Sequence, residues 1–93
     1  MSTYAVNYRY AASHDELAEL RPAHRAWLEG LLEQGTLLAS GPLGDFAGAL
    51  LLMKATDEAE LSSILDNDPF DIAGFIGERV IEEWNPIFSP FNK

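Results

Sequence analysis

The chain has 93 residues, of which 47% are apolar or aromatic, and it has a formal net charge of −9 and no cysteine. This composition suits one domain over residues 1–93 and excludes a disordered chain, a disulfide scaffold and thiolate metal sites. The scattered Lys and Arg residues argue against a nucleic acid or an anionic membrane as partner. No apolar run approaches the roughly 20 residues of a membrane span, and Met1–Tyr4 lacks a secretory pattern, so we expect a cytoplasmic protein.

The first predicted element is a strand over residues 4–10. Its apolar and aromatic side chains recur at every second position, which is typical of a strand with one buried face. These side chains are Tyr4, Val6, Tyr8 and Tyr10.

A helical region follows, beginning at a capping box formed by Ser13 and Glu16. Pro22 falls inside this region, and proline is tolerated in the first turn of a helix but not in its interior. We therefore expect a short turn over residues 14–20 and a main helix from residue 22 to residue 34. The apolar stripe of that helix consists of Trp27, Leu28, Leu31 and Leu32.

Gly35 is expected to cap this helix, and a hairpin of two strands follows it. Residues 36–40 read as the first strand, and residues 41–45, with two glycines and a proline, are typical of a turn. Residues 47–55 read as the second strand. Their continuously apolar stretch over residues 49–53 indicates a strand that is buried on both faces.

A second helix is expected from Thr56 or Asp57, and it ends before Pro69 because the residue before a proline avoids the helical conformation. A connector over residues 70–74 leads to a last strand over residues 76–84. We expect the apolar side chains of the tail to be packed rather than free. These side chains are Ile87, Phe88 and Phe91.

This order of elements predicts the α+β class and the ferredoxin-like βαββαβ arrangement, in which two helices cover one face of an antiparallel four-stranded sheet. The strand over residues 47–55 is nevertheless apolar on both faces. A second copy of the chain is the simplest cover for the other face, so the pattern predicts a homodimer.

His24 and Asp68 are the residues whose chemistry stands out. Of the two histidines, His14 lies in the capping turn and is interpreted as exposed, which leaves His24 as the natural proton carrier near neutral pH. If the helix starts at Pro22, its positive end disfavours the imidazolium of His24, whereas a carboxylate such as Asp68 favours it. On pattern alone, both residues also have structural explanations, as a surface or core histidine and as the end of a helix before Pro69.

Several short motifs occur in a fixed order along most of the chain. They are Arg21-Pro22-Ala23-His24, Leu28, Gly35, Ser40-Gly41-Pro42-Leu43, Gly48, Asp66-Asn67-Asp68-Pro69-Phe70 and Ala73-Gly74. In this order and spacing the chain resembles the YciI-like (YCII-related) family, a branch of the dimeric α+β barrel superfamily. The resemblance implies the ferredoxin-like fold and the homodimer.

The resemblance also implies a site built on a His–Asp pair, which corresponds here to His24 and Asp68. It places Ser40 in the same pocket, next to Gly41 and Pro42 of the hairpin. The Ser40 hydroxyl could bind a substrate oxygen, and a glycine allows the backbone to approach closely.

Aromatic and basic side chains are further candidates for this pocket. We assign Phe70 to substrate binding, and Tyr8 and Trp27 fit the same apolar wall, although aromatic residues at such spacing are more often part of the core. Arg21 and Arg25 fit the steering of an anionic substrate. A surface role is favoured for both, with Arg25 paired to an acidic residue one helical turn later.

The resemblance favours a cofactor-free enzyme that transfers protons with His24 and Asp68, as a lyase or isomerase acting on a small organic acid. The family includes elimination of chloride from a chlorinated muconate-type acid, and the superfamily includes muconolactone isomerases and small monooxygenases. The alternatives are a non-catalytic small-molecule-binding or accessory module and a cofactor-free monooxygenase-like enzyme. No metal is expected, because zinc takes about three to four protein ligands. No phosphate loop is expected either, because Gly41 and Gly44 lie in a hairpin.

Overall fold

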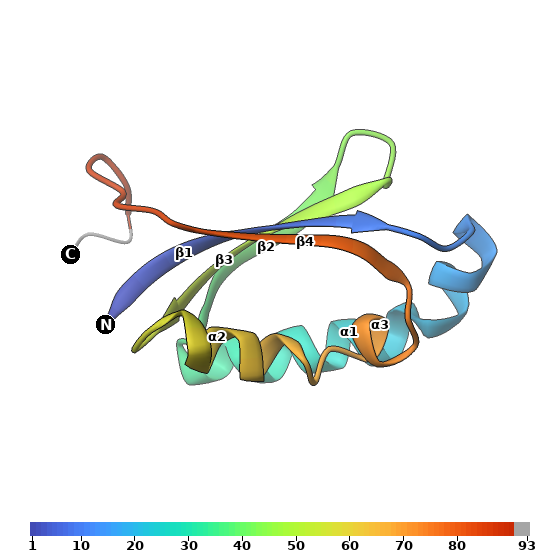
Figure 1. The fold of residues 1–93 in the computed structure, drawn as a ribbon, viewed down its shortest axis with the longest axis horizontal. Helices are drawn as coiled ribbons and strands as arrows, with labels where there is room; N and C mark the ends of the chain where they lie inside the picture. Colours follow the sequence, from blue (N-terminus) through green and yellow to red (C-terminus); the bar gives the residue numbers. More distant parts are fainter. Residues whose placement is uncertain (91–93) are drawn as a thin grey trace.

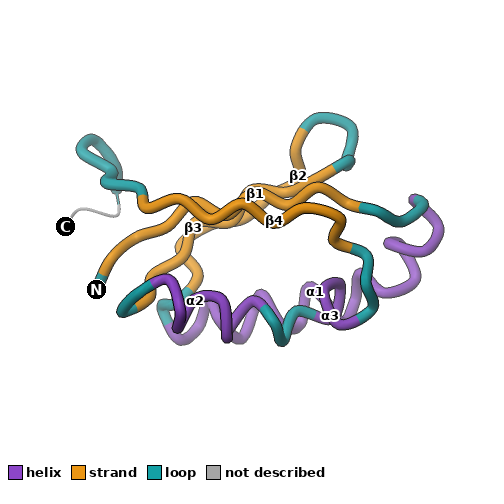
Figure 2. Tube along the Cα trace, in the orientation of Figure 1, coloured by secondary structure: helices purple, strands orange, loops and turns teal. Residues whose placement is uncertain are grey.

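A computed structural model describes residues 1–90 of the chain. Four strands form one antiparallel sheet, and the helices lie together on one side of it (Figures 1 and 2). This arrangement confirms the predicted α+β class and the βαββαβ order, with one short helix added. In chain order the elements are β1 (Ser2–Tyr10), α1 (His14–Gln34), β2 (Leu37–Leu43), β3 (Gly48–Ala55), α2 (Glu58–Leu65), α3 (Pro69–Ile72) and β4 (Ile76–Glu83).

The sheet has the order β2-β3-β1-β4, so β3 and β1 are central and β2 and β4 form the edges. Val6 of β1 lies opposite Leu51 of β3 and Ile81 of β4, which places these three side chains on one face. This inner face packs against the helices, and Leu61 and Leu65 of α2 are fully buried against it. The core therefore lies between the sheet and the helical layer.

The outer face of the sheet is not buried within the chain. Leu50 and Leu52 of β3 point to this face and are only half-buried, and Val80 of β4 and Trp84 after it are exposed at 39% and 36%. The expectation that the second strand of the hairpin is buried on both faces is therefore wrong for one copy of the chain. The helices lie on the inner face (Figure 1), so within residues 1–90 no helix covers these side chains.

The helical region is one continuous helix, α1, and the break expected at Pro22 is wrong. The capping box of Ser13 and Glu16 is present, and Gly35 ends the helix in the left-handed conformation with φ of 80°. Leu17 and His24 are both buried, so the face that packs on the protein continues across Pro22. Tertiary packing on both sides of the proline holds a bent helix together (Figure 1).

Two segments that were expected to be irregular have regular structure. Gly41 and Pro42 belong to β2 rather than to the turn, which begins after Leu43. β2 is an edge strand, where the missing amide of a proline does not interrupt pairing. The expected connector after Asp68 begins with the helix α3.

The tail after β4 differs from the expectation of packed apolar side chains. Phe88 is 97% exposed in the single chain, and Phe91 lies outside the described residues. Within residues 1–90, none of the helices is both long and apolar enough to cross a membrane.

Candidate active site

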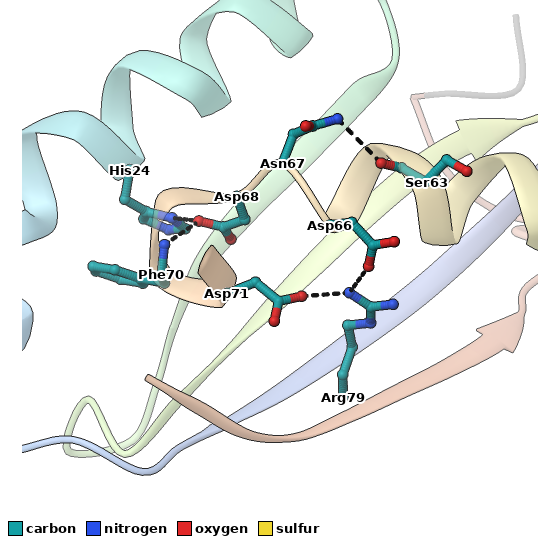
Figure 3. A network of polar contacts seen from close by, with 8 residues as sticks. All are labelled: His24, Ser63, Asp66, Asn67, Asp68, Phe70, Asp71 and Arg79. Atoms are coloured by element: carbon teal, nitrogen blue, oxygen red, sulfur yellow. Dashed lines mark hydrogen bonds and ion pairs between the residues drawn. The ribbon is translucent and has the colours of Figure 1, made fainter. Parts of the chain in front are cut away.

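The fold brings together His24 and Asp68, which are 44 positions apart in the sequence (Figure 3). His24 Nδ1 lies 2.8 Å from Asp68 Oδ1. Both side chains are buried, with 7% of His24 and 0% of Asp68 exposed. The packing of α3 against α1 creates this contact, because α1 carries His24 and Asp68 caps α3.

The local sequence around Asp68 explains the position of its carboxylate. Asp68 is the N-cap of α3, and its Oδ1 accepts a hydrogen bond of 2.9 Å from the backbone N–H of Phe70. Pro69 at the start of α3 favours this geometry because its φ is already helical. The oxygen that caps α3 is also the oxygen that contacts His24. The cap therefore fixes the orientation of the Asp68 carboxylate toward the His24 ring.

This contact determines which ring nitrogen of His24 carries a proton. An ionised carboxylate only accepts hydrogen bonds, so His24 Nδ1 must donate its N–H to Asp68 Oδ1. In the neutral ring, Nε2 then keeps its lone pair and is available as a proton acceptor. Asp68 therefore orients the His24 ring through Nδ1 and leaves Nε2 outside this contact.

Phe70 fixes the plane of the imidazole. Its ring stacks on His24 with the centroids 4.1 Å apart and an angle of 9° between the planes. Tyr10 packs edge-on against Phe70, with the centroids 5.5 Å apart. Hydrogen bonding from one side and stacking from the other thus hold the His24 ring in one orientation.

A cavity of about 220 Å³ lies beside His24. The predicted substrate-binding residues all line it: Ser40, Gly41 and Pro42 from β2, and Phe70 from α3. The other residues that line it are Tyr10, Arg21, Arg25, Leu28, Phe46, Ala49 and Leu51. α1, the hairpin and α3 therefore converge on one hollow at which the His24 ring is accessible.

Some sequence interpretations of this region are corrected. His24 lies ten residues after the first residue of α1, so the positive end of the helix does not act on it. Tyr8 and Trp27 belong to the core and its surroundings and do not line the cavity. Arg25 is not paired with an acidic side chain among residues 1–90 but lines the cavity together with Arg21.

An ion-pair network that the sequence analysis missed holds the segment that carries Asp68 (Figure 3). Arg79 of β4 contacts Asp66 Oδ1 at 3.0 Å and Asp71 Oδ2 at 2.5 Å, on either side of Asp68 in the sequence. Asn67 adds a bond of 3.1 Å from its side-chain amide to the carbonyl of Ser63. The network ties this segment to the sheet and to α2. In the sequence, the feature that could have pointed to this network is the pair of aspartates on either side of Asp68.

Two buried polar atoms in this region have no hydrogen-bond partner among the described residues. They are the Tyr8 hydroxyl and the second carboxylate oxygen of Asp68, Oδ2. Burial raises the pKa of Tyr8 above its ordinary value, and the nearby charge of Asp68 raises it further. Burial also raises the pKa of Tyr10, with a second contribution from Asp68 that Arg21 opposes.

These raised values predict an alkaline dependence of stability. The pKa values of Tyr8 and Tyr10 are ordinary, 10.0, in the unfolded chain and higher in the folded one, so the folded state holds its protons longer. Their contribution is complete below pH 10.0 and is lost as the pH rises above it. Urea unfolding across this range should show a falling free energy of unfolding. The fall should be smaller in a Tyr8→Phe/Tyr10→Phe double variant, and equal slopes in the two proteins would contradict the assignment.

Within residues 1–90, no three His, Cys, Asp or Glu side chains cluster in a way that could hold a metal ion. His24 and Asp68 alone provide two donors, and they are bonded to each other.

Comparison with solved structures gives neighbours with the same fold. A 5-chloro-2-hydroxyhydroquinone dehydrochlorinase from Burkholderia phenoliruptrix AC1100, in complex with 2,5-dihydroxybenzoquinone, is 26% identical with a TM-score of 0.78, and the match covers 89% of this chain and 93% of that one. A protein described as a candidate antibiotic biosynthesis monooxygenase from Nitrosomonas europaea is 11% identical with a TM-score of 0.62, over 95% and 100% of the two chains. An uncharacterised NIPSNAP domain protein from Burkholderia xenovorans is 16% identical with a TM-score of 0.57, over 97% and 99%.

Comparison with curated protein sequences finds no match. The family model described as the YCII-related domain matches residues 1–85, which include every strand and helix and both members of the His–Asp pair. The resemblance seen in the short sequence motifs is thereby confirmed. The chain belongs to the YCII-related domain family.

Proposed function

We propose that the protein is a cofactor-free enzyme that transfers protons on a small organic acid, in a lyase or isomerase reaction. The observation that carries this proposal is the buried His24–Asp68 pair at the edge of a cavity that is lined by apolar and basic side chains. Burial makes such a pair expensive to maintain for stability alone, which favours a role in chemistry.

In the proposed reaction, His24 Nε2 removes a proton from a carbon next to a carbonyl group. The electrons of the broken C–H bond form a new C=C bond, and the carboxylate of Asp68 stabilises the imidazolium that results. In an elimination, a leaving group such as chloride departs from the neighbouring carbon with its electron pair, and His24 later loses its proton to water. In an isomerisation, His24 returns the proton to another carbon. The Ser40 hydroxyl at the cavity rim donates a hydrogen bond to the carbonyl oxygen.

The dehydrochlorinase neighbour supports the elimination form of this proposal. That protein is 26% identical over most of both chains, and its structure holds a dihydroxybenzoquinone. A cavity of about 150 Å³ is enough for benzene in another protein, and the cavity here is about 220 Å³. Its size therefore suits a single substituted ring or an open-chain acid of similar size.

The test is an assay for proton transfer and halide release. The protein is incubated in deuterated water with a panel of chlorinated hydroxyquinones, unsaturated acids and lactones, and deuterium uptake and free chloride are measured. Turnover with at least one member is expected. Consumption of oxygen during turnover would favour a cofactor-free monooxygenase. One structural neighbour, which shares only the fold, is described as a monooxygenase. Ligand binding without turnover would favour a binding module.

The proposal also includes a homodimer, in which a second copy covers the half-exposed outer face around Leu50, Leu52 and Val80. The exposed aromatic rings of Trp84 and Phe88 add to the apolar surface that such a partner would cover. Light scattering that shows a stable monomer would contradict this part of the proposal.

A further inference from the structure

The cavity beside His24 has a charge opposite to that of the protein as a whole. The chain has six basic and fifteen acidic residues, yet two of the six, Arg21 and Arg25, line this cavity. None of the residues that line it is acidic. Among residues 1–90, neither arginine forms an ion pair with the protein. Two arginines without an ion-pair partner among the described residues therefore line one hollow in an acidic molecule.

The helix places these two arginines on either side of the proposed base. Arg21, His24, Arg25 and Leu28 recur at the spacing of one helical face, and all four line the cavity. Arg21 and Arg25 are one turn apart, about 6 Å along the axis, with His24 between them. An anion bound by both would lie next to the His24 ring.

The two arginines differ in exposure. Arg21 is half-buried and close enough to Tyr10 to oppose the rise in the pKa of that tyrosine, whereas Arg25 is exposed at the rim. A partly desolvated guanidinium holds a carboxylate more strongly than an exposed one, and an exposed charge mainly accelerates the encounter with an anion. The positions therefore suit an anchor at Arg21 and steering at Arg25.

We propose that Arg21 and Arg25 form a carboxylate-binding subsite that determines which substrates the protein accepts. The inference rests on the proposed function, because it concerns the substrate of the same site. Arginine binds carboxylates through paired charge-assisted hydrogen bonds, which a neutral amide cannot replace. The substrate class is therefore a small carboxylate, of which the anchored group lies next to the carbon that His24 would deprotonate.

The experiment measures binding, so it does not require turnover. The probes are 2,5-dihydroxybenzoate and its neutral isostere 2,5-dihydroxybenzamide, and titration calorimetry is carried out on the wild-type protein, Arg21→Met, Arg25→Met and Arg9→Met. Arg9→Met is the matched control, because Arg9 is exposed on β1 and does not line the cavity. The wild-type protein should bind the acid on the order of tenfold to a hundredfold more tightly than the amide.

Arg21→Met should abolish this preference, while Arg25→Met should lower the affinity for the acid to a smaller extent and weaken the dependence of that affinity on salt. Arg9→Met should behave like the wild type. Equal affinity for acid and amide, no acid binding at millimolar concentration, or a preference that survives in the Arg21→Met/Arg25→Met double variant would overturn the subsite.

Comparing these titrations with the turnover assay of the wild-type protein separates this inference from the proposed function. If the protein prefers the acid but turns over no substrate, the subsite stands and the proposed enzyme is overturned. If it turns over neutral substrates and has no preference for the acid, the proposed enzyme stands and the subsite is overturned.

Discussion

Replacing Asp68 with alanine is expected to lower the free energy of unfolding by about 2–5 kcal/mol, from lost capping and from an unpaired buried donor. The change removes both bonds of Asp68 Oδ1, so His24 Nδ1 and the amide of Phe70 lose their acceptor. Both groups lie in a part of the protein that water does not reach easily. Urea unfolding followed by circular dichroism measures the loss.

Two other variants show where the loss comes from. Asp68→Asn keeps an oxygen that can accept both hydrogen bonds, so it should cost clearly less than the alanine. Asp45→Ala removes an exposed turn aspartate that bonds the amide of Ala47 at 3.3 Å, and it should change stability by less than about 1 kcal/mol. If Asp68→Ala were as stable as Asp45→Ala, the buried pair would not make the expected contribution to the free energy of unfolding.

Replacing His24 is expected to reduce turnover by about 10²- to 10⁴-fold, the contribution of a positioned acid or base. His24→Asn is the sharpest variant, because its side-chain amide can take the place of Nδ1 and donate to Asp68 Oδ1. It keeps the contact with Asp68 but has no group in place of Nε2. Turnover should fall, whereas the free energy of unfolding should fall less than in His24→Ala, because the contact with Asp68 is kept and only the stacking on Phe70 is lost.

His24→Ala is the companion variant, in which the buried carboxylate also loses its partner and both turnover and stability should fall. Steady-state kinetics of both variants, with circular dichroism as the control for folding, separate the two effects. Turnover by His24→Asn at the wild-type rate would exclude His24 as the base. A binding module would show a change in affinity alone.

The sequence predicted the strands well because the period-two pattern of Tyr4, Val6 and Tyr8 follows directly from burial of one face. The contact between His24 and Asp68 has no such local signature. It joins residues that are distant in the chain, and only the family motifs pointed to it. The network of Arg79 with Asp66 and Asp71 was missed for the same reason.

The sequence analysis named Arg21 and Arg25 as candidates for the pocket but favoured a surface role, because an acidic partner one helical turn later was available to Arg25. The break placed at Pro22 was a separate error. Local rules for proline describe a helix that stands alone, whereas α1 is held by packing on both sides of the proline. The rules for turn residues failed in the same way at Gly41 and Pro42, which an edge strand accommodates.

Pro22 also divides α1 into two parts that we expect to open independently. Because Pro22 has no amide hydrogen, the carbonyl of Ala18 lacks its helical donor, and the ladder of hydrogen bonds is interrupted there. Before this point Leu17 is the buried residue, whereas Trp27, Leu28 and Leu31 after it pack against the core, so fewer contacts hold the first turns than hold the rest of the helix. Local opening of those turns can stop at the proline without reaching the cavity, and amide hydrogen exchange should be faster before Pro22 than after it. The interruption would then act as a boundary that keeps fraying of the helix end away from His24.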